Sequence, residues 1–280
     1  MLLDCISSFF TLGSFLILLG WSTYGNTQEP SAATNTPRPW LFGQATSFSG
    51  PIATDRPTFS LGTGTIPKGR IQFETGYTFS SDNKNSGITT HTFPETLFRI
   101  GLTDILEMRI EWPTQVLIRN ETKVSGLKDL ALGFKAQVFQ QDRWIPQISI
   151  ASRLLIPTGN KDLSSNHVEP EVLAILSYTL NERISLFGNA NVGSVSSQDK
   201  RFAQFSSSLG LNVNFGNALS GFIEYFGFYP VSSSTQNIYF LQTGVVYQVT
   251  RHLQLDTRAG IGLNRDADDV LTGAGLSWRF

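Results

Sequence analysis

Apolar and polar residues alternate with a period of two along most of the chain from residue 69 to its end. In residues 106–112, LEMRIEW, every second residue is apolar and the residues between are charged. Such alternation is typical of a β-strand whose two faces meet different environments. We count about twelve segments of this kind, each of roughly 9–13 residues, and no segment predicts a helix of three turns. The pattern therefore predicts an all-β protein.

The connections between these segments alternate in length. Short ones fall at 102–104, 140–143, 181–183, 216–217 and 250–252, and longer polar ones at 81–87, 113–125, 157–168, 194–200, 230–236 and 264–269. Tight turns at one end and longer loops at the other are typical of bacterial outer-membrane barrels. We therefore predict a transmembrane antiparallel up-and-down β-barrel of about twelve strands in the bacterial outer membrane. A soluble sandwich or barrel, the alternative, should have shorter strands and a charged outer face.

Composition narrows the class further. Of the 280 residues, 15% are charged, the mean hydropathy is −0.05 and the formal net charge is −1. A near-neutral chain lacks the basic footprint of a nucleic-acid-binding protein, so nucleic acid is not an expected partner. One cysteine excludes a disulfide scaffold. The charged fraction is low, yet the mean hydropathy is not high. Both values fit a wall of strands with one face toward lipid and the other toward a polar lumen.

The N-terminus has the pattern of an export signal. Residues 9–21, FFTLGSFLILLGW, are too short to cross a bilayer comfortably but match the apolar core of a signal peptide. No basic residue precedes them, so an uncleaved anchor is the alternative. We predict a signal peptide at 1–25, a polar disordered lead-in at 26–53 and the barrel at 54–280.

Charged residues recur at strand positions. On the lipid face each would cost about 2–4 kcal/mol near the membrane midplane, so we expect them to face the lumen. The lumen and selectivity candidates are Glu74, Arg99, Glu107, Arg109, Glu111, Asp129, Lys135, Arg153, Glu224, Asp256 and Arg258. They could form an ion-pair lattice that fills the barrel, or line a conduit that selects solutes. Twelve strands lie between filled eight-stranded barrels and open porins of 16–18 strands, which favours a narrow or gated pore.

Residues 40–69 show no clear strand pattern. Within them, the segment 54–69 could enter the lumen as a plug, with Asp55 and Arg56 pairing with wall charges, or could extend into the periplasm. The sequence leaves both open.

Catalytic and metal-binding patterns are weak. Nucleophilic catalysis needs a histidine oriented beside a serine, and none of His91, His167 and His252 is followed by a serine two residues later. No His or Cys cluster has the spacing of metal ligands. We therefore predict no enzyme activity, no metal and no cofactor. A membrane-embedded hydrolase that depends on His167 is the less favoured alternative.

Short motifs in a fixed order resemble a known family. They are TDRP at 54–57, IPKGRIQFETG at 66–76, GLTD at 101–104, KDLALGFK at 128–135, IPTG at 156–159, FIE at 222–224, QLD at 254–256 and GAGLSWRF at 273–280. The order resembles the bacterial outer-membrane transporter family assigned to the meta-pathway of phenol degradation. The last motif, ending in Trp278 and Phe280, also resembles the signal read by the barrel-assembly machinery.

The resemblance implies passage of small, often aromatic compounds across the outer membrane. We therefore expect a barrel that lets small solutes, aromatic or hydrophobic ones included, cross passively. Its expected partners are outer-membrane lipid, the barrel-assembly machinery and a small-molecule solute. The alternative from another class is a non-conducting structural or surface-interaction barrel.

Overall fold

The computed structural model describes residues 39–40, 43–46, 50–84, 86–120, 123–197, 200–232 and 235–280. The predicted signal peptide and most of the predicted lead-in lie outside these residues. The described part consists of strands and connections, and it contains no helix that is long and apolar enough to cross a membrane. The strands are β1 (Pro39–Trp40), β2 (Gly43–Gln44), β3 (Ile71–Asp82), β4 (Ile88–Phe93), β5 (Thr96–Gly101), β6 (Leu106–Trp112), β7 (Gln115–Arg119), β8 (Lys123–Leu127), β9 (Leu130–Phe139), β10 (Gln147–Ile156), β11 (Glu169–Thr179), β12 (Ile184–Ser197), β13 (Lys200–Asn214), β14 (Leu219–Pro230), β15 (Ile238–Gln248), β16 (Leu253–Gly262) and β17 (Val270–Arg279).

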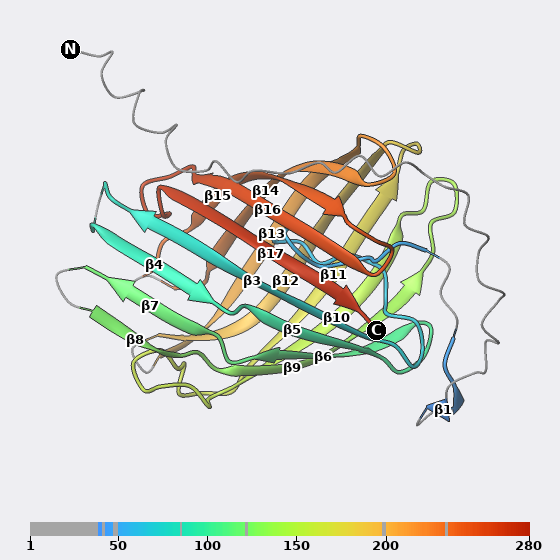
Figure 1. Cartoon of the computed structure of the whole chain (residues 1–280). Helices are drawn as coiled ribbons and strands as arrows, with labels where there is room; N and C mark the ends of the chain where they lie inside the picture. The colour runs from blue at the N-terminus through green and yellow to red at the C-terminus, as the bar shows by residue number, and fades with distance from the viewer. Residues whose placement is uncertain are drawn as a thin grey trace, which may run out of the picture. The chain divides into compact units, whose positions relative to one another are not determined.

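The strands from β3 to β17 form one antiparallel sheet that closes on itself (Figure 1). Closure is made by β17 and β3, whose ladder runs from Val270 opposite Ser81 to Arg279 opposite Gln72. Three wall strands consist of two consecutive segments each, namely β4 with β5, β6 with β7 and β8 with β9. The described residues thus contain twelve wall strands, which confirms the predicted barrel.

Three neighbouring wall strands are interrupted along one side of the barrel. Two of the breaks contain Pro94 and Pro113, which lack the backbone N–H that a ladder needs. Beyond the breaks, β4, β7 and β8 form a three-stranded extension. The loop predicted at 113–125 is therefore wrong, because it contains β7 and part of β8. Alternation also holds in these strands, but over only five residues each.

The two faces of the wall differ as the alternation predicts. Outward-facing apolar side chains are well exposed, as at Leu209 (64%) and Ile223 (48%). Lumen-facing polar side chains are buried, including Glu107 and Lys135 at 0%. One face of the wall therefore suits lipid, and the other surrounds a packed polar interior.

The short turns and the C-terminus lie at one end of the barrel (Figure 1). In bacterial outer-membrane barrels the short turns face the periplasm. In this orientation the long loops mark the outer end.

Candidate solute pathway in the barrel lumen

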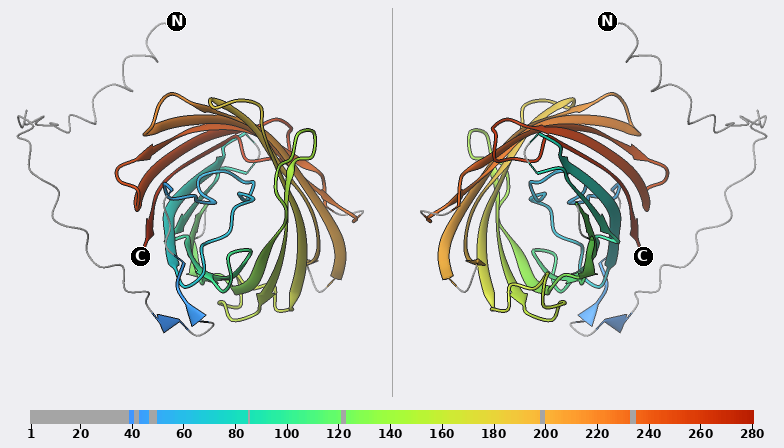
Figure 2. Two further views of the ribbon diagram at one scale, coloured as in Figure 1. Left: turned by 90° about the vertical axis from the view of Figure 1, so that its right-hand side faces the viewer. Right: turned by 90° about the vertical axis from the view of Figure 1, so that its left-hand side faces the viewer.

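Residues 50–66 enter the lumen from the periplasmic end and return to it. Near the start, the Arg279 guanidinium donates to the carbonyl oxygen of Gly50 at 2.7 Å. After the segment, the backbone N–H of Lys68 donates to Asp104, in the turn between β5 and β6, at 3.2 Å. Figure 2 shows this part of the chain inside the ring of strands. Ile52, expected in the lead-in, is already buried at 2% exposure.

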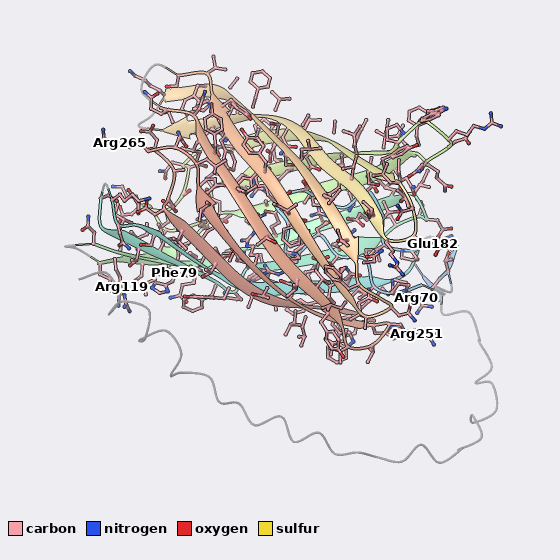
Figure 3. All side chains as sticks on the ribbon, turned by 90° about the horizontal axis from the view of Figure 1, so that it is seen from above. Arg70, Phe79, Arg119, Glu182, Arg251 and Arg265 are labelled. Atoms are coloured by element: carbon pink, nitrogen blue, oxygen red, sulfur yellow. The ribbon has the colours of Figure 1, made fainter. Side chains whose placement is uncertain are left out.

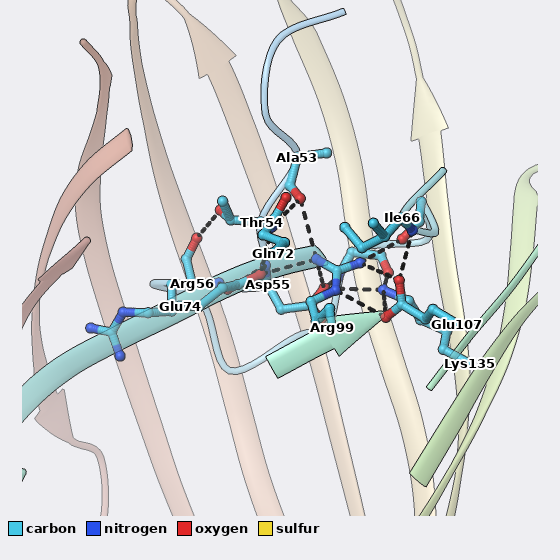
Figure 4. A network of polar contacts seen from close by, with 12 residues as sticks. Ala53, Thr54, Asp55, Arg56, Ile66, Gln72, Glu74, Arg99, Glu107 and Lys135 are labelled. Carbon is cyan, nitrogen blue, oxygen red and sulfur yellow. Dashed lines mark hydrogen bonds and ion pairs between the residues drawn. The ribbon is translucent and has the colours of Figure 1, made fainter. Parts of the chain in front are cut away.

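Asp55 lies in a buried ionic cluster on the wall of β3, β5, β6 and β9 (Figure 4). Its carboxylate contacts Arg109, and its Oδ1 lies 3.3 Å from Lys135 Nζ and 3.6 Å from an Arg99 nitrogen. The same carboxylate accepts a hydrogen bond from the Gly62 N–H at 2.8 Å, which closes the segment into a compact loop.

The wall residues of this cluster are themselves paired. Arg99 donates both Nε and Nη2 to the Glu107 carboxylate at 2.9 Å, and its Nη1 donates to Glu74 at 3.1 Å. Glu74 also accepts from the backbone N–H groups of Asp55 and Arg56, at 3.0 and 3.1 Å. The cluster contains the cations Arg99, Arg109 and Lys135 and the anions Asp55, Glu74 and Glu107. It is neutral only with Asp55 in place.

The charges around Asp55 control its protonation. Burial alone would raise the pKa of Asp55, but Arg99, Lys135 and Arg109 outweigh burial and hold that pKa well below its ordinary value of 3.8. The carboxylate is therefore ionised at neutral pH, and the cluster keeps its charge balance.

Arg56 anchors the segment to the seam where the barrel closes. Its guanidinium forms ion pairs with Glu95 at 3.0 Å and Asp256 at 3.3 Å. It lies over the facing glycines Gly76 and Gly275, where a Cβ on either residue would come within 2.3 Å of its atoms. The seam leaves room for this side chain because both residues are glycine.

Polar groups of the remaining wall also hold the segment. Glu224 accepts from the backbone N–H groups of Phe59 and Ser60 at 2.8 Å, and the Oγ atoms of Ser60 and Ser208 lie 2.6 Å apart. On β10, the Ser149 hydroxyl donates to the carbonyl oxygen of Thr63 at 2.6 Å. The segment thus contacts opposite sides of the lumen.

Apolar contacts complete the docking. Phe59 stacks on Phe226, with ring centroids 4.6 Å apart. Leu61 packs against a buried apolar patch of the wall formed by Ala151, Leu173 and Ile175. Phe59, Ser60 and Leu61 carry no charge pattern, so sequence reasoning missed them.

Three cavities adjoin the segment. Two lie toward the outer end, with volumes of about 290 and 360 Å³, and one lies toward the periplasm, with a volume of about 390 Å³. Leu61 lines all three, and Arg56 and Thr58 line the inner cavity and the larger outer one. The boundary between the outer and inner space therefore lies at these side chains.

The two ends of the lumen differ in charge. Glu111, Arg153 and Glu171 line an outer cavity, and Arg153 lies 2.8 Å from Glu111 and 3.7 Å from Glu171. The inner cavity is lined mainly by hydroxyl, amide and small groups, together with Phe187 and Phe222.

The remaining candidates have separate positions. Arg258 donates to the carbonyl oxygen of Pro57 at 3.1 Å, so it too holds the segment. Asp129 instead precedes β9 and accepts from the N–H groups of Gly159 and Ser165, at 2.8 and 2.9 Å. It fixes an outer loop rather than joining the central cluster.

The histidines lie apart from this region. His91 bonds Tyr77 through its Nδ1 at 2.8 Å, and His252 Nδ1 lies 3.2 Å from the Arg279 carbonyl oxygen. His167 Nδ1 contacts the backbone carbonyl oxygen of Ser165, at 3.2 Å, and not the side-chain hydroxyl that catalysis would need. In the part of the chain that the structure describes, no three His, Cys, Asp or Glu side chains are grouped as metal ligands.

A family model described as "Putative MetA-pathway of phenol degradation" matches residues 54–280. The chain belongs to this family. The match covers the whole barrel and all but the first four residues of the segment that enters the lumen. No curated protein sequence matches the chain.

Solved structures share the fold of this family member. One is the COG4313 outer membrane channel from Pseudomonas putida F1, at 17% identity and a TM-score of 0.59, covering 78% of this chain and 98% of that one. Another is the NanC porin, at 9% identity and a TM-score of 0.52, covering 74% and 98%. The protein is a β-barrel of the bacterial outer membrane.

Proposed function

We propose that this barrel lets small solutes cross the outer membrane passively, and that residues 50–66 act as a plug that restricts their passage and must move from its wall contacts to let them through. The observation that carries the proposal is the division of the lumen into outer and inner cavities at this segment. The family description supports aromatic compounds among the solutes. The two similar structures, a channel and a porin, agree with passage through the lumen.

The cavity linings support selection for small molecules of low charge. A solute that leaves the charged outer cavities must pass Leu61 and Thr58 to reach the inner cavity. The inner cavity offers the rings of Phe187 and Phe222 beside hydroxyl and amide groups. Such a lining suits a compact molecule with one apolar face and a few polar groups.

Swelling of proteoliposomes tests this function. Liposomes that contain the folded protein should swell in small aromatic alcohols and short neutral solutes, and much more slowly in large sugars. Liposomes with heat-unfolded protein are the control. Equal swelling with folded and unfolded protein for every solute would contradict the proposal.

A non-conducting barrel is the second candidate. The contacts of residues 50–66 with opposite sides of the lumen favour it, because together they close the interior. It predicts no flux even when the anchors of the segment are removed.

A further inference from the structure

The outer face of the extension formed by β4, β7 and β8 carries a cross-strand row of polar and basic residues. Register places Ser81 beside Thr89, Thr89 beside Arg119, and Arg119 beside Lys123. Arg119 and Lys123 are both exposed. Like charges directly opposite each other in a sheet are destabilising unless something compensates them.

The alternation shows which way this row faces. Thr92 pairs with Thr78, whose hydroxyl donates to Glu95 and accepts from Arg258 inside the barrel. Thr92 also pairs with Val116, which is 1% exposed, so this set of positions faces inward. Arg119 is three residues from Val116 and belongs to the opposite set, which faces outward.

An aromatic shelf lies below the row on the same face. Tyr77, Phe79, His91 and Phe93 contact one another, with ring centroids between 5.2 and 6.3 Å apart. Tyr77 and Phe93 are each 39% exposed. Aromatic girdles mark the membrane interfaces of outer-membrane barrels.

The height of the row places it at the outer interface. Phe280 N–H bonds to Ile71, at the periplasmic end of β3, and Ser81 lies ten residues further along. Ten residues span roughly 33 Å along a strand. At a tilt of about 40° this gives a height of about 25 Å, the thickness of the apolar band. Figure 3 shows Arg119 and Phe79 at the end opposite Arg70 and Arg251.

Neither basic side chain is neutralised within the described residues. No ion pair there joins a carboxylate to Arg119 or Lys123, whereas Lys84, also at the outer end, lies 2.8 Å from Asp269. Two cations that form no ion pair within the described residues, above an aromatic shelf and at the level of lipid headgroups, complement an anionic headgroup.

We propose that Arg119 and Lys123, with the hydroxyl of Thr89, bind the phosphate of an outer-leaflet glycolipid whose acyl chains pack along the aromatic shelf. This site is on the outer surface and does not depend on solute passage. An arginine fork together with a lysine is well suited to phosphate oxygens, and the bound phosphate removes the repulsion between the two side chains.

Native mass spectrometry of the detergent-purified full chain with lipid A tests the site. The wild type should retain phosphorylated lipid A in preference to dephosphorylated lipid A. The Arg119→Gln/Lys123→Gln variant should weaken retention of the phosphorylated form by about fivefold for each charge removed. Arg119→Lys, which keeps the charge, should retain most of the preference.

The matched control is Arg183→Gln/Arg251→Gln, which removes two exposed charges from periplasmic turns. It should bind lipid A like the wild type, and heat-dependent gel mobility should show that all variants are folded barrels. Unchanged retention in the Arg119→Gln/Lys123→Gln variant would overturn the proposal. So would an equal loss in the control, equal binding of dephosphorylated lipid A, or equal binding of phosphatidylglycerol vesicles.

Discussion

Asp55 completes the charge balance of the lumen. The wall side chains of the ionic cluster contribute three cations and two anions, and the carboxylate of Asp55 supplies the third anion. Removing one partner of a buried ion pair typically costs about 3–5 kcal/mol, because the remaining charge stays buried without compensation. The docking of residues 50–66 should therefore depend strongly on this one residue.

Replacement of Asp55 tests that dependence. Asp55→Asn should weaken docking by about 3–5 kcal/mol, while the ladder of the barrel stays intact. Limited proteolysis from the periplasmic side should then cut within residues 50–66 in the variant but not in the wild type. Asp162→Asn, in an outer loop, is the control and should leave the segment protected. A protected segment in Asp55→Asn would contradict the assigned role.

The depressed pKa of Asp55 gives a pH prediction. Because the docked pKa lies below the ordinary value of 3.8, the carboxylate stabilises docking fully above that value. This stabilisation decreases as the pH falls below 3.8 toward the docked pKa. Solute flux through proteoliposomes should therefore be constant between about pH 8 and pH 5 and rise only below about pH 4. A rise centred near pH 6 would show that another group controls docking.

Leu61 should limit the size of the solutes. It lines all three cavities, and its side chain rests on an apolar patch of the wall. Leu61→Ala should raise the flux of intermediate-sized solutes, and Leu61→Trp should lower it. Val195→Ala, which trims only an outer cavity, is the control. Equal flux in both Leu61 variants would place the constriction elsewhere.

Among the structural elements, the strands were predictable because lipid and lumen impose opposite demands on successive residues. The alternation of apolar and polar residues therefore predicted the long strands and the short turns between them. It failed in β7 and β8, where Pro113 interrupts the wall and each strand is only five residues long. Asp129, a lumen candidate, precedes β9, is buried and accepts hydrogen bonds from the loop at 157–168, a role that the alternation alone did not predict.

The last strand, β17, provides a test of assembly. We propose that Trp278 and Phe280, stacked at 5.3 Å between ring centroids, form the signal read by the assembly machinery. Phe280→Ser should lower the amount of folded barrel in outer membranes several-fold, as measured by heat-dependent gel mobility. Phe215→Ser, which replaces a similarly exposed aromatic residue near a periplasmic turn, should not lower it. Equal losses would point to general destabilisation.

At the scale of the whole molecule, the position of residues 50–66 could not be located from sequence alone. The sequence pattern of residues 54–69 was compatible with a position either in the lumen or in the periplasm. Their partners lie far along the chain: Arg56 pairs with Asp256, 200 residues away, and Ser60 with Glu224, 164 residues away. Only closure of the barrel brings these groups together. The sequence could still predict that the wall charges face the lumen, because a lipid-facing wall cannot carry them.

The most direct test of the proposed plug is a reversible cross-link between the segment and the wall. The Oγ atoms of Ser60 and Ser208 lie 2.6 Å apart, close enough for a disulfide after replacement by cysteine. Proteoliposomes with Ser60→Cys/Ser208→Cys should lose solute flux when oxidised and regain it when reduced, and either single variant should be insensitive to oxidation. Equal flux through the oxidised and reduced double variant would show that solutes cross without movement of this segment, contrary to the proposed function.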